Sequence, residues 1–105
     1  MIDLAPEHLS FIREIIYRHI AACKVYVFGS RNQGNAKKYS DLDLAVQAQG
    51  KLTIQEIGRI TEDFQESSLP FRVDLHDWHR LSDEFRRIIE KDCELLPEWT
   101  SAEKF

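Results

Sequence analysis

The sequence predicts a small α/β domain, built from a mixed sheet of about three strands with flanking helices. Two observations favour this fold class. Apolar residues recur at helical spacing in three segments, and three other segments are short, rich in β-formers and bounded by turn residues. The 105 residues suffice for one hydrophobic core but not for two. We therefore expect residues 1–105 to form a single domain.

The first half of the chain predicts one helix and two strands. Apolar residues recur at helical spacing from Leu9 to Ile20, and Pro6 suits a first helical turn. Residues 24–28 are rich in β-branched and aromatic side chains and predict a strand that Gly29 stops. Residues 41–46 alternate polar and apolar side chains, which is typical of a strand with one buried face.

The second half predicts a helix, a strand and a last helix. Thr53 can cap the second helix, whose expected apolar stripe comprises Ile54, Ile57, Ile60 and Phe64. Residues 71–75 alternate again and predict the third strand. Ser82 can cap the last helix, with three residues expected to face inward: Phe85, Ile88 and Ile89.

Composition narrows the classes of function. The formal net charge of −4 argues against nucleic-acid binding and against binding to an anionic membrane, both of which rely on basic surfaces. No apolar run is long enough to span a membrane, and no signal peptide is visible. Cys23 and Cys93 are isolated, which is typical of thiols in a reducing compartment. We therefore expect a cytoplasmic protein.

Three acidic residues lie on predicted strands. Asp41 and Asp43 are two apart, so both point to one face of their strand with Cα atoms roughly 6.6 Å apart. Asp74 lies on the polar face of the third strand. Three carboxylates on one face favour a bridging cation, and hard oxygen ligands favour Mg²⁺ or Mn²⁺ over zinc. The alternative is three solvated charges on an open sheet face, but Asp is depleted in strands.

Gly29 and Ser30 follow the first strand directly. Glycine allows close approach to a ligand, and Ser30 can begin a helical turn whose N–H groups attract phosphate. Arg31 adds positive charge nearby. An ordinary turn with a serine cap is the simpler alternative. If the first two strands are antiparallel neighbours, however, these phosphate donors face Asp41 and Asp43 and could hold a nucleoside triphosphate with its metal.

These motifs together resemble a known signature. Gly29-Ser30, ten residues and Asp41-Leu42-Asp43 resemble the signature of the DNA polymerase β-like nucleotidyltransferase superfamily. The string GSRNQGNAKKYSDLDLAV is similar to its minimal nucleotidyltransferase (MNT, MntA-type) branch. The resemblance covers about residues 20–90 and includes Asp74, where the family places its third carboxylate.

The resemblance implies a function and a set of site residues. Members of this branch pair with helical HEPN RNase toxins and, as antitoxins, transfer AMP from ATP to a toxin tyrosine. By this resemblance Asp41 and Asp43 would bind Mg²⁺, and Asp74 would complete the metal site and help to activate the attacking hydroxyl. Gly29 and Ser30 would hold the triphosphate.

Two other functions remain open at this stage. The chain could be a non-catalytic module that blocks the toxin by complex formation, or a nucleotidyltransferase for a small molecule such as an aminoglycoside. We expect these 105 residues to form one domain, with no second domain to hold a small acceptor. The acceptor would then be a protein that forms a hetero-oligomer with the chain, unless the chain completes its site as a homo-oligomer.

Aromatic and histidine residues near the end of the chain admit several interpretations. His76 and His79 could suggest zinc, but the spacing lacks the context of known zinc patterns, and surface histidines are expected. Trp78 is expected to pack beside the third strand. Trp99 and Phe105 could equally dock on their own domain or contact a partner.

Overall fold

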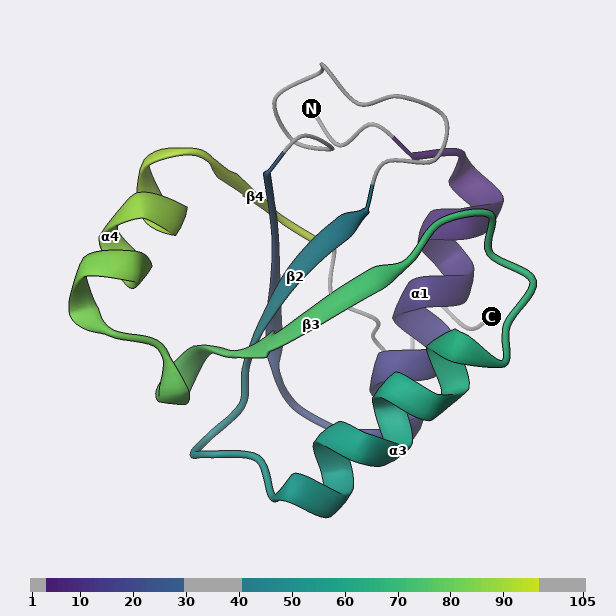
Figure 1. Cartoon of the computed structure of the whole chain (residues 1–105), viewed down its shortest axis with the longest axis horizontal. Helices are drawn as coiled ribbons and strands as arrows, with labels where there is room; N and C mark the ends of the chain where they lie inside the picture. Colours follow the sequence, from purple (N-terminus) through teal and green to yellow (C-terminus); the bar gives the residue numbers. More distant parts are fainter. Residues whose placement is uncertain (1–3, 30–40, 97–105) are drawn as a thin grey trace.

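The computed structural model describes residues 4–29 and 41–96 of the chain. Its elements follow the predicted alternation of helices and strands (Figure 1). In chain order they are α1 (Pro6–His19), β1 (Lys24–Phe28), β2 (Leu42–Gln47), α3 (Ile54–Gln65), β3 (Val73–Asp77), the 3-10 helix η1 (Trp78–Arg80), α4 (Asp83–Lys91) and β4 (Cys93–Leu95).

The sheet is mixed, as predicted, and its strand order is β3-β2-β1-β4. β1 pairs antiparallel with both β2 and β4, whereas β2 pairs parallel with β3 through the α3 crossover. The prediction of about three strands omitted β4, so the sheet has four strands within residues 4–29 and 41–96. β4 has only three residues, which is too short for an alternating pattern to show in the sequence.

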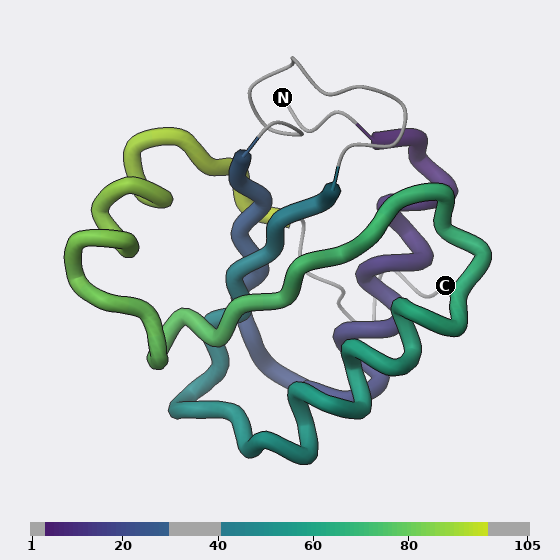
Figure 2. Tube along the Cα trace, viewed as in Figure 1, coloured from purple at the N-terminus to yellow at the C-terminus, as the bar shows by residue number. Residues whose placement is uncertain are grey.

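The two faces of the sheet are covered differently. α1 and α3 lie together on one face, where Leu42, Leu44 and Val46 point into the main core (Figure 1). α4 and η1 lie on the opposite face over a smaller cluster of Ala45, Trp78 and Ile89. The C-terminal end of β1 and the N-terminal end of β2, which border residues 30–40, lie side by side at one end of the sheet (Figure 2). Within the described residues, no helix is long and apolar enough to cross a membrane.

Local sequence chemistry explains where α3 begins. The Thr53 hydroxyl accepts a hydrogen bond from the Glu56 N–H at 3.0 Å, and the Glu56 carboxylate accepts one from the Thr53 N–H at 2.9 Å. This reciprocal capping box confirms the predicted cap. Ile60 and Phe64 are buried as predicted, but Ile54 is 77% exposed. At 3.6 residues per turn, Ile54 lies about 90° from the centre of the buried stripe.

The buried face of α4 also differs from the predicted one. Ile89 is buried, whereas Ile88 is 64% exposed. The side of α4 that carries Arg86 faces Trp78. The Arg86 Nε donates to the Trp78 carbonyl at 2.9 Å, and the Arg86 guanidinium lies 5.8 Å from the centre of the Trp78 ring. Trp78 follows β3 directly in the chain but does not pack beside it as predicted. It lies over β1 and β2, where it clusters with Ala45 and stacks on Tyr26 at 4.9 Å between ring centres.

The two faces of α3 give a test of the core. We expect Ile60→Ala to lower the free energy of unfolding by about 2–5 kcal/mol, because it leaves a cavity between α3 and the sheet. Ile54→Ala is the matched control and should change it by less than about 0.5 kcal/mol. Urea unfolding of both variants measures the difference, and similar losses would contradict the observed orientation of α3.

Candidate active site at one end of the sheet

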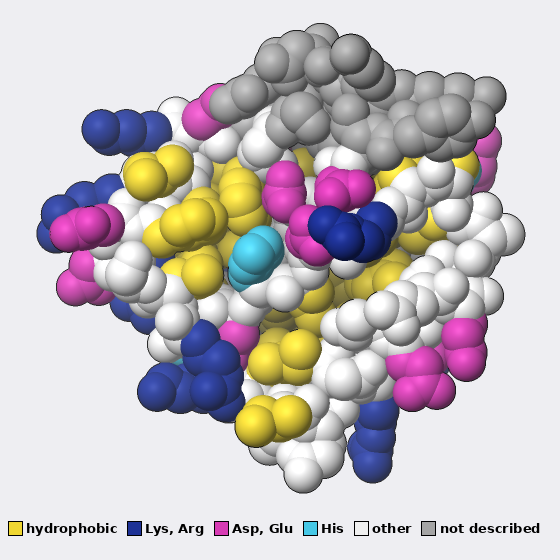
Figure 3. Space-filling model, viewed as in Figure 1, with side chains coloured by type: hydrophobic (Ala, Val, Ile, Leu, Met, Phe, Trp, Pro, Cys, Tyr) yellow, Lys and Arg dark blue, Asp and Glu magenta, His cyan; other side chains and the backbone are white. Residues whose placement is uncertain are grey.

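The register of β2 and β3 brings two of the predicted carboxylates together. Asp43 and Asp74 are direct partners in the parallel ladder, and adjacent strands lie about 4.8 Å apart. Asp41 immediately precedes β2 and lies on the same face as Asp43. This face is opposite the one that α1 and α3 cover, and acidic side chains gather on it beside hydrophobic ones (Figure 3). β1 and β2 are antiparallel neighbours, so the condition under which Gly29 faces these carboxylates is met.

Arg72 lies across two of these carboxylates and was not predicted as a site residue. Its Nη2 atom donates to Asp41 Oδ2 at 3.0 Å and to Asp74 Oδ2 at 3.5 Å. Asp41 and then Asp74 raise the pKa of the Arg72 guanidinium, which remains positively charged. Strand alternation places Arg72 on the same face as Asp74, and this signal could have identified it from the sequence.

The Asp43 carboxyl is partly buried beside the other two aspartates. Partial burial and then the charge of Asp74 raise the pKa of the Asp43 carboxyl, while His76 and Arg72 act in the opposite direction. A raised pKa means that the surroundings of the carboxyl disfavour its charged form. A bound cation would relieve this cost, so the site is electrostatically prepared for one.

Gly29 approaches Asp43 so closely that no larger residue fits. Its φ of +79° lies in the left-handed region, and a Cβ at this position would lie 2.5 Å from Asp43 Oδ2. Both the backbone angle and the close approach therefore require glycine. The other two predicted phosphate ligands, Ser30 and Arg31, lie outside the described residues, as do Trp99 and Phe105.

The donor set fits a hard divalent cation by its chemistry. Among the described residues, no three Asp, Glu, His or Cys side chains converge as a ready metal cage. Mg²⁺ retains several of its waters and takes only one or two carboxylates together with substrate phosphates, so it does not need such a cage. The side-chain oxygens of Asp41, Asp43 and Asp74 are of the type that Mg²⁺ prefers. Arg72 would have to release Asp41 or Asp74 for either to become a ligand.

Aromatic side chains border the carboxylates. Phe28, which pairs with Asp43 across the β1–β2 ladder, lies 5.6 Å from the His76 ring and 5.9 Å from the Phe85 ring. These rings belong to β1, β3 and α4, so they form a partly apolar wall between the acidic cluster and α4.

The histidines near β3 have structural surroundings. The His79 Nε2 atom lies 2.7 Å from the Ala48 carbonyl. Asp77 is buried on the core side of β3, accepts from the Leu52 N–H at 2.8 Å and pairs with Arg80 at 3.3 Å. These contacts tie the start of α3 to β3.

Fold and site together define an α/β protein with an acidic cluster and a glycine turn at one end of its sheet. The chain belongs to the polymerase beta nucleotidyltransferase family, whose model matches residues 11–99. It is 44% identical over 90 residues to a protein of Haemophilus influenzae named probable protein adenylyltransferase MntA. That match covers 86% of this chain and 79% of the relative.

Solved structures share the fold. One is a toxin-antitoxin with AMP-PNP, with a TM-score of 0.73 and 23% identity, covering 95% of this chain and 79% of that chain. Another is a tri-AMPylated Shewanella oneidensis HEPN toxin in complex with MNT antitoxin, with a TM-score of 0.69 and 22% identity. It covers 93% of this chain and 76% of that chain. The expected α/β fold of a minimal nucleotidyltransferase is confirmed.

The tight packing of Gly29 gives a prediction. Gly29→Ala should lower the free energy of unfolding by about 1–2 kcal/mol through backbone strain and should also displace the Asp43 carboxylate. Gly50→Ala is the control, because a Cβ there meets nothing within 4 Å. Urea unfolding and carboxyl NMR shifts of Asp43 measure the two effects. Equal behaviour of the two variants would contradict this close approach.

The raised pKa of Asp43 gives a second prediction. The folded chain holds the Asp43 proton more tightly than the unfolded chain does. Protonation of Asp43 therefore stabilises the folded state at pH values below the ordinary pKa of the carboxyl. This stabilisation is lost as the pH rises through the pKa that Asp43 has in the folded state. We expect Asp43→Asn to raise the stability of the metal-free protein at pH 7.

This stability gain should shrink as pH falls through the carboxyl range, where the wild-type Asp43 takes up its own proton. Thermal unfolding in chelator across this pH range measures it. A variant that is less stable than the wild type at pH 7 would show that Asp43 stabilises the fold.

Proposed function

We propose that this protein is a metal-dependent protein adenylyltransferase that transfers AMP from ATP to a tyrosine of a HEPN-type RNase toxin and thereby neutralises it. The observation that carries the proposal is the in-register pairing of Asp43 with Asp74, beside Asp41 and opposite Gly29. The 44% identity to a probable protein adenylyltransferase supports the reaction class. Similarity to a fold found with an AMPylated HEPN toxin supports the type of partner.

Each site residue has a proposed role. Asp41 and Asp43 would hold Mg²⁺ with Asp74, and Gly29, with Ser30 and Arg31 beyond it, would receive the triphosphate. A divalent cation held by these residues would supply positive charge that offsets the charge developing on the phosphates during transfer. Asp74 belongs to β3, the edge strand, and can accept the proton of an incoming hydroxyl.

Asp43 and Arg72 complete the electrostatic setting. Partial burial of Asp43 excludes water from one side of the cluster, which strengthens its interaction with a cation. Arg72 holds Asp41 and Asp74 on the same side of the sheet despite their like charge. A cation that binds the cluster would take the place of Arg72 on Asp41 or Asp74.

One observation favours a second candidate function, that of a non-catalytic antitoxin. Ile88 and Leu95 are exposed on α4 and β4, and they offer apolar surface to a protein partner. A non-catalytic antitoxin could use such a surface to block the toxin without any transfer. Binding alone does not require three carboxylates on one face, so transfer explains more of the structure.

The transfer reaction is directly testable. Incubated with ATP, Mg²⁺ and its cognate HEPN partner, the wild-type protein should add AMP to the partner, which intact-mass spectrometry detects. Asp43→Asn and Asp74→Asn should each lower the rate by about 100-fold or more, because each removes charge from the cluster. Asp83→Asn is the matched control, since Asp83 is a well-exposed carboxylate at the start of α4.

The control variant should transfer at the wild-type rate. If the wild-type protein binds its partner tightly and no mass shift appears, the non-catalytic antitoxin is the correct function. If the Asp43 and Asp74 variants both transfer at the wild-type rate, the acidic cluster does not carry the reaction.

A further inference from the structure

Three aromatic side chains from three different elements meet beside the acidic cluster. The ring centres of Phe28 on β1 and His76 on β3 lie 5.6 Å apart. The Phe85 ring of α4 lies 5.9 Å from the Phe28 ring and 6.2 Å from the His76 ring. The three rings therefore form one continuous surface, and we refer to Phe28, His76 and Phe85 together as the aromatic wall.

The sheet register joins the aromatic wall to the carboxylates. Phe28 is the ladder partner of Asp43, and Asp43 is in turn the ladder partner of Asp74. His76 lies two residues after Asp74 on β3, so both side chains point to the same face. Side chains of direct partners in an antiparallel pair lie about 4.5–5.5 Å apart. The aromatic wall therefore begins one strand away from Asp43, on the face that carries the carboxylates.

The rings of the aromatic wall are accessible to a ligand. Phe85 is 37% exposed, and Phe28 and His76 are half-buried. Acidic, histidine and hydrophobic side chains lie next to one another at the surface of this face (Figure 3). An aromatic surface beside a charged site can receive the flat face of a ligand whose charged end binds at that site.

The two sides of Asp43 differ in what they offer to a bound nucleotide. Gly29, which is proposed to receive the triphosphate, follows Phe28 directly, so the phosphate site and the aromatic wall are adjacent on β1. On the β3 side, Arg72 contacts Asp74 and presents charge instead of apolar surface. Only one ribose separates the base of a nucleotide from its α-phosphate, so the base must lie close to the phosphate site. The aromatic wall is the apolar surface that meets this requirement.

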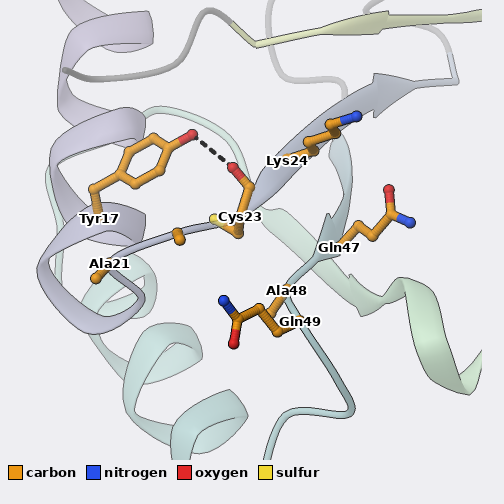
Figure 4. Close-up of a pocket in the computed structure, with 8 residues that line it drawn as sticks. Tyr17, Ala21, Cys23, Lys24, Gln47, Ala48 and Gln49 are labelled. Atoms are coloured by element: carbon orange, nitrogen blue, oxygen red, sulfur yellow. Dashed lines mark hydrogen bonds between the residues drawn. The ribbon is translucent and has the colours of Figure 1, made fainter.

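A cavity at the other end of the sheet is separate from this surface. It measures about 400 Å³ and lies between the end of α1, the start of β1 and the end of β2 (Figure 4). Lys24 and Gln47, which line it, are ladder partners at the opposite end of the β1–β2 pair from Phe28 and Asp43. Four residue steps separate Lys24 from Phe28, or about 13 Å. A base joined through one ribose to phosphates at Gly29 therefore lies nearer to the aromatic wall than to this cavity.

We propose that the aromatic wall is the base-binding surface of the nucleotide site, and that the base stacks on the exposed ring of Phe85. The inference rests on the proposed function, because it takes a nucleoside triphosphate as the donor. Every base has a π-face, so stacking is tolerant of base identity. Phe28 and Phe85 carry no hydrogen-bonding side-chain groups. They therefore supply affinity for a base and little discrimination between adenine and guanine.

The test separates binding of the base from binding of the phosphates. Calorimetry with Mg²⁺ and without the partner compares ATP with inorganic tripolyphosphate, which has three phosphates and no base. Phe85→Ala removes the ring, and Phe85→Leu keeps apolar volume but has no π-face. Ile88→Ala is the matched control, because Ile88 is an exposed apolar residue of the same helix outside the aromatic wall. Nuclear Overhauser contacts between the base protons of ATP and the ring protons of Phe85 locate the base directly.

We expect the wild-type protein to bind ATP about 10-fold more tightly than tripolyphosphate, which is the contribution of one stacked base. Both Phe85 variants should lose this preference and keep the wild-type affinity for tripolyphosphate. Ile88→Ala should bind both ligands as the wild type does, and GTP should bind to the wild type about as tightly as ATP. The base protons should show Overhauser contacts with the Phe85 ring.

Other outcomes overturn the inference in distinct ways. Unchanged ATP affinity in both Phe85 variants would show that the ring only packs α4 on the sheet. Weaker binding of tripolyphosphate in these variants would show that Phe85 supports the phosphate site instead of the base. Lower ATP affinity in Gln49→Trp, which fills the cavity at the other end of the sheet, would place the base there. The proposed function is tested separately, by AMP transfer from the wild-type protein to its partner.

Discussion

The parallel pairing of β2 with β3 is the constraint on which the rest of the structure depends. Parallel neighbours cannot be joined by a tight turn, so the chain must cross over one face of the sheet between them. α3 makes this crossing and buries Ile60 and Phe64 against the sheet. The same connection sets Asp74 beside Asp43. One topological requirement thus produces the core and the acidic cluster.

The acidic cluster brings three negative charges together, and nearby positive charge offsets their repulsion only in part. Arg72 contacts two of the carboxylates, but it is well exposed, and exposed ion pairs contribute little to stability. Asp43 has no such direct partner among the described basic residues and keeps a raised pKa. The site therefore retains an electrostatic cost, which a bound cation can convert into binding affinity. A fold selected for stability alone would not place three aspartates here.

Much of this architecture was predictable because its signals are local. β1 was predicted at its observed bounds, and the alternation in β2 correctly assigned Asp43 to one face and Leu42 and Leu44 to the other. The Thr53 cap depends on residues three apart and was also predicted correctly. The side-chain periods of helices and strands, and helix caps, follow from backbone geometry over a few neighbouring residues. They can therefore be predicted from the sequence alone.

The features that were missed depend on contacts between distant segments. β4 becomes a strand only because β1 offers it an edge, and its three residues carry no pattern of their own. Ile88 is exposed because Arg86 turns α4 toward Trp78, which is a tertiary contact. Arg72 carried a usable signal in its alternation with Asp74, but the ion pair with Asp41 spans 31 positions of the chain.

The limited attachment of α4 has a consequence for motion. Ile89 is its buried residue, and Arg86 adds a hydrogen bond to Trp78, whereas the central strand β2 is buried along most of its length. Local opening costs least where few apolar contacts must break. In hydrogen exchange, the amides of α4 would then lose protection before those of β2. Such an opening uncovers Phe28 and His76 beside the aspartates, so the face that bears the acidic cluster is covered by the helix that opens more readily than β2.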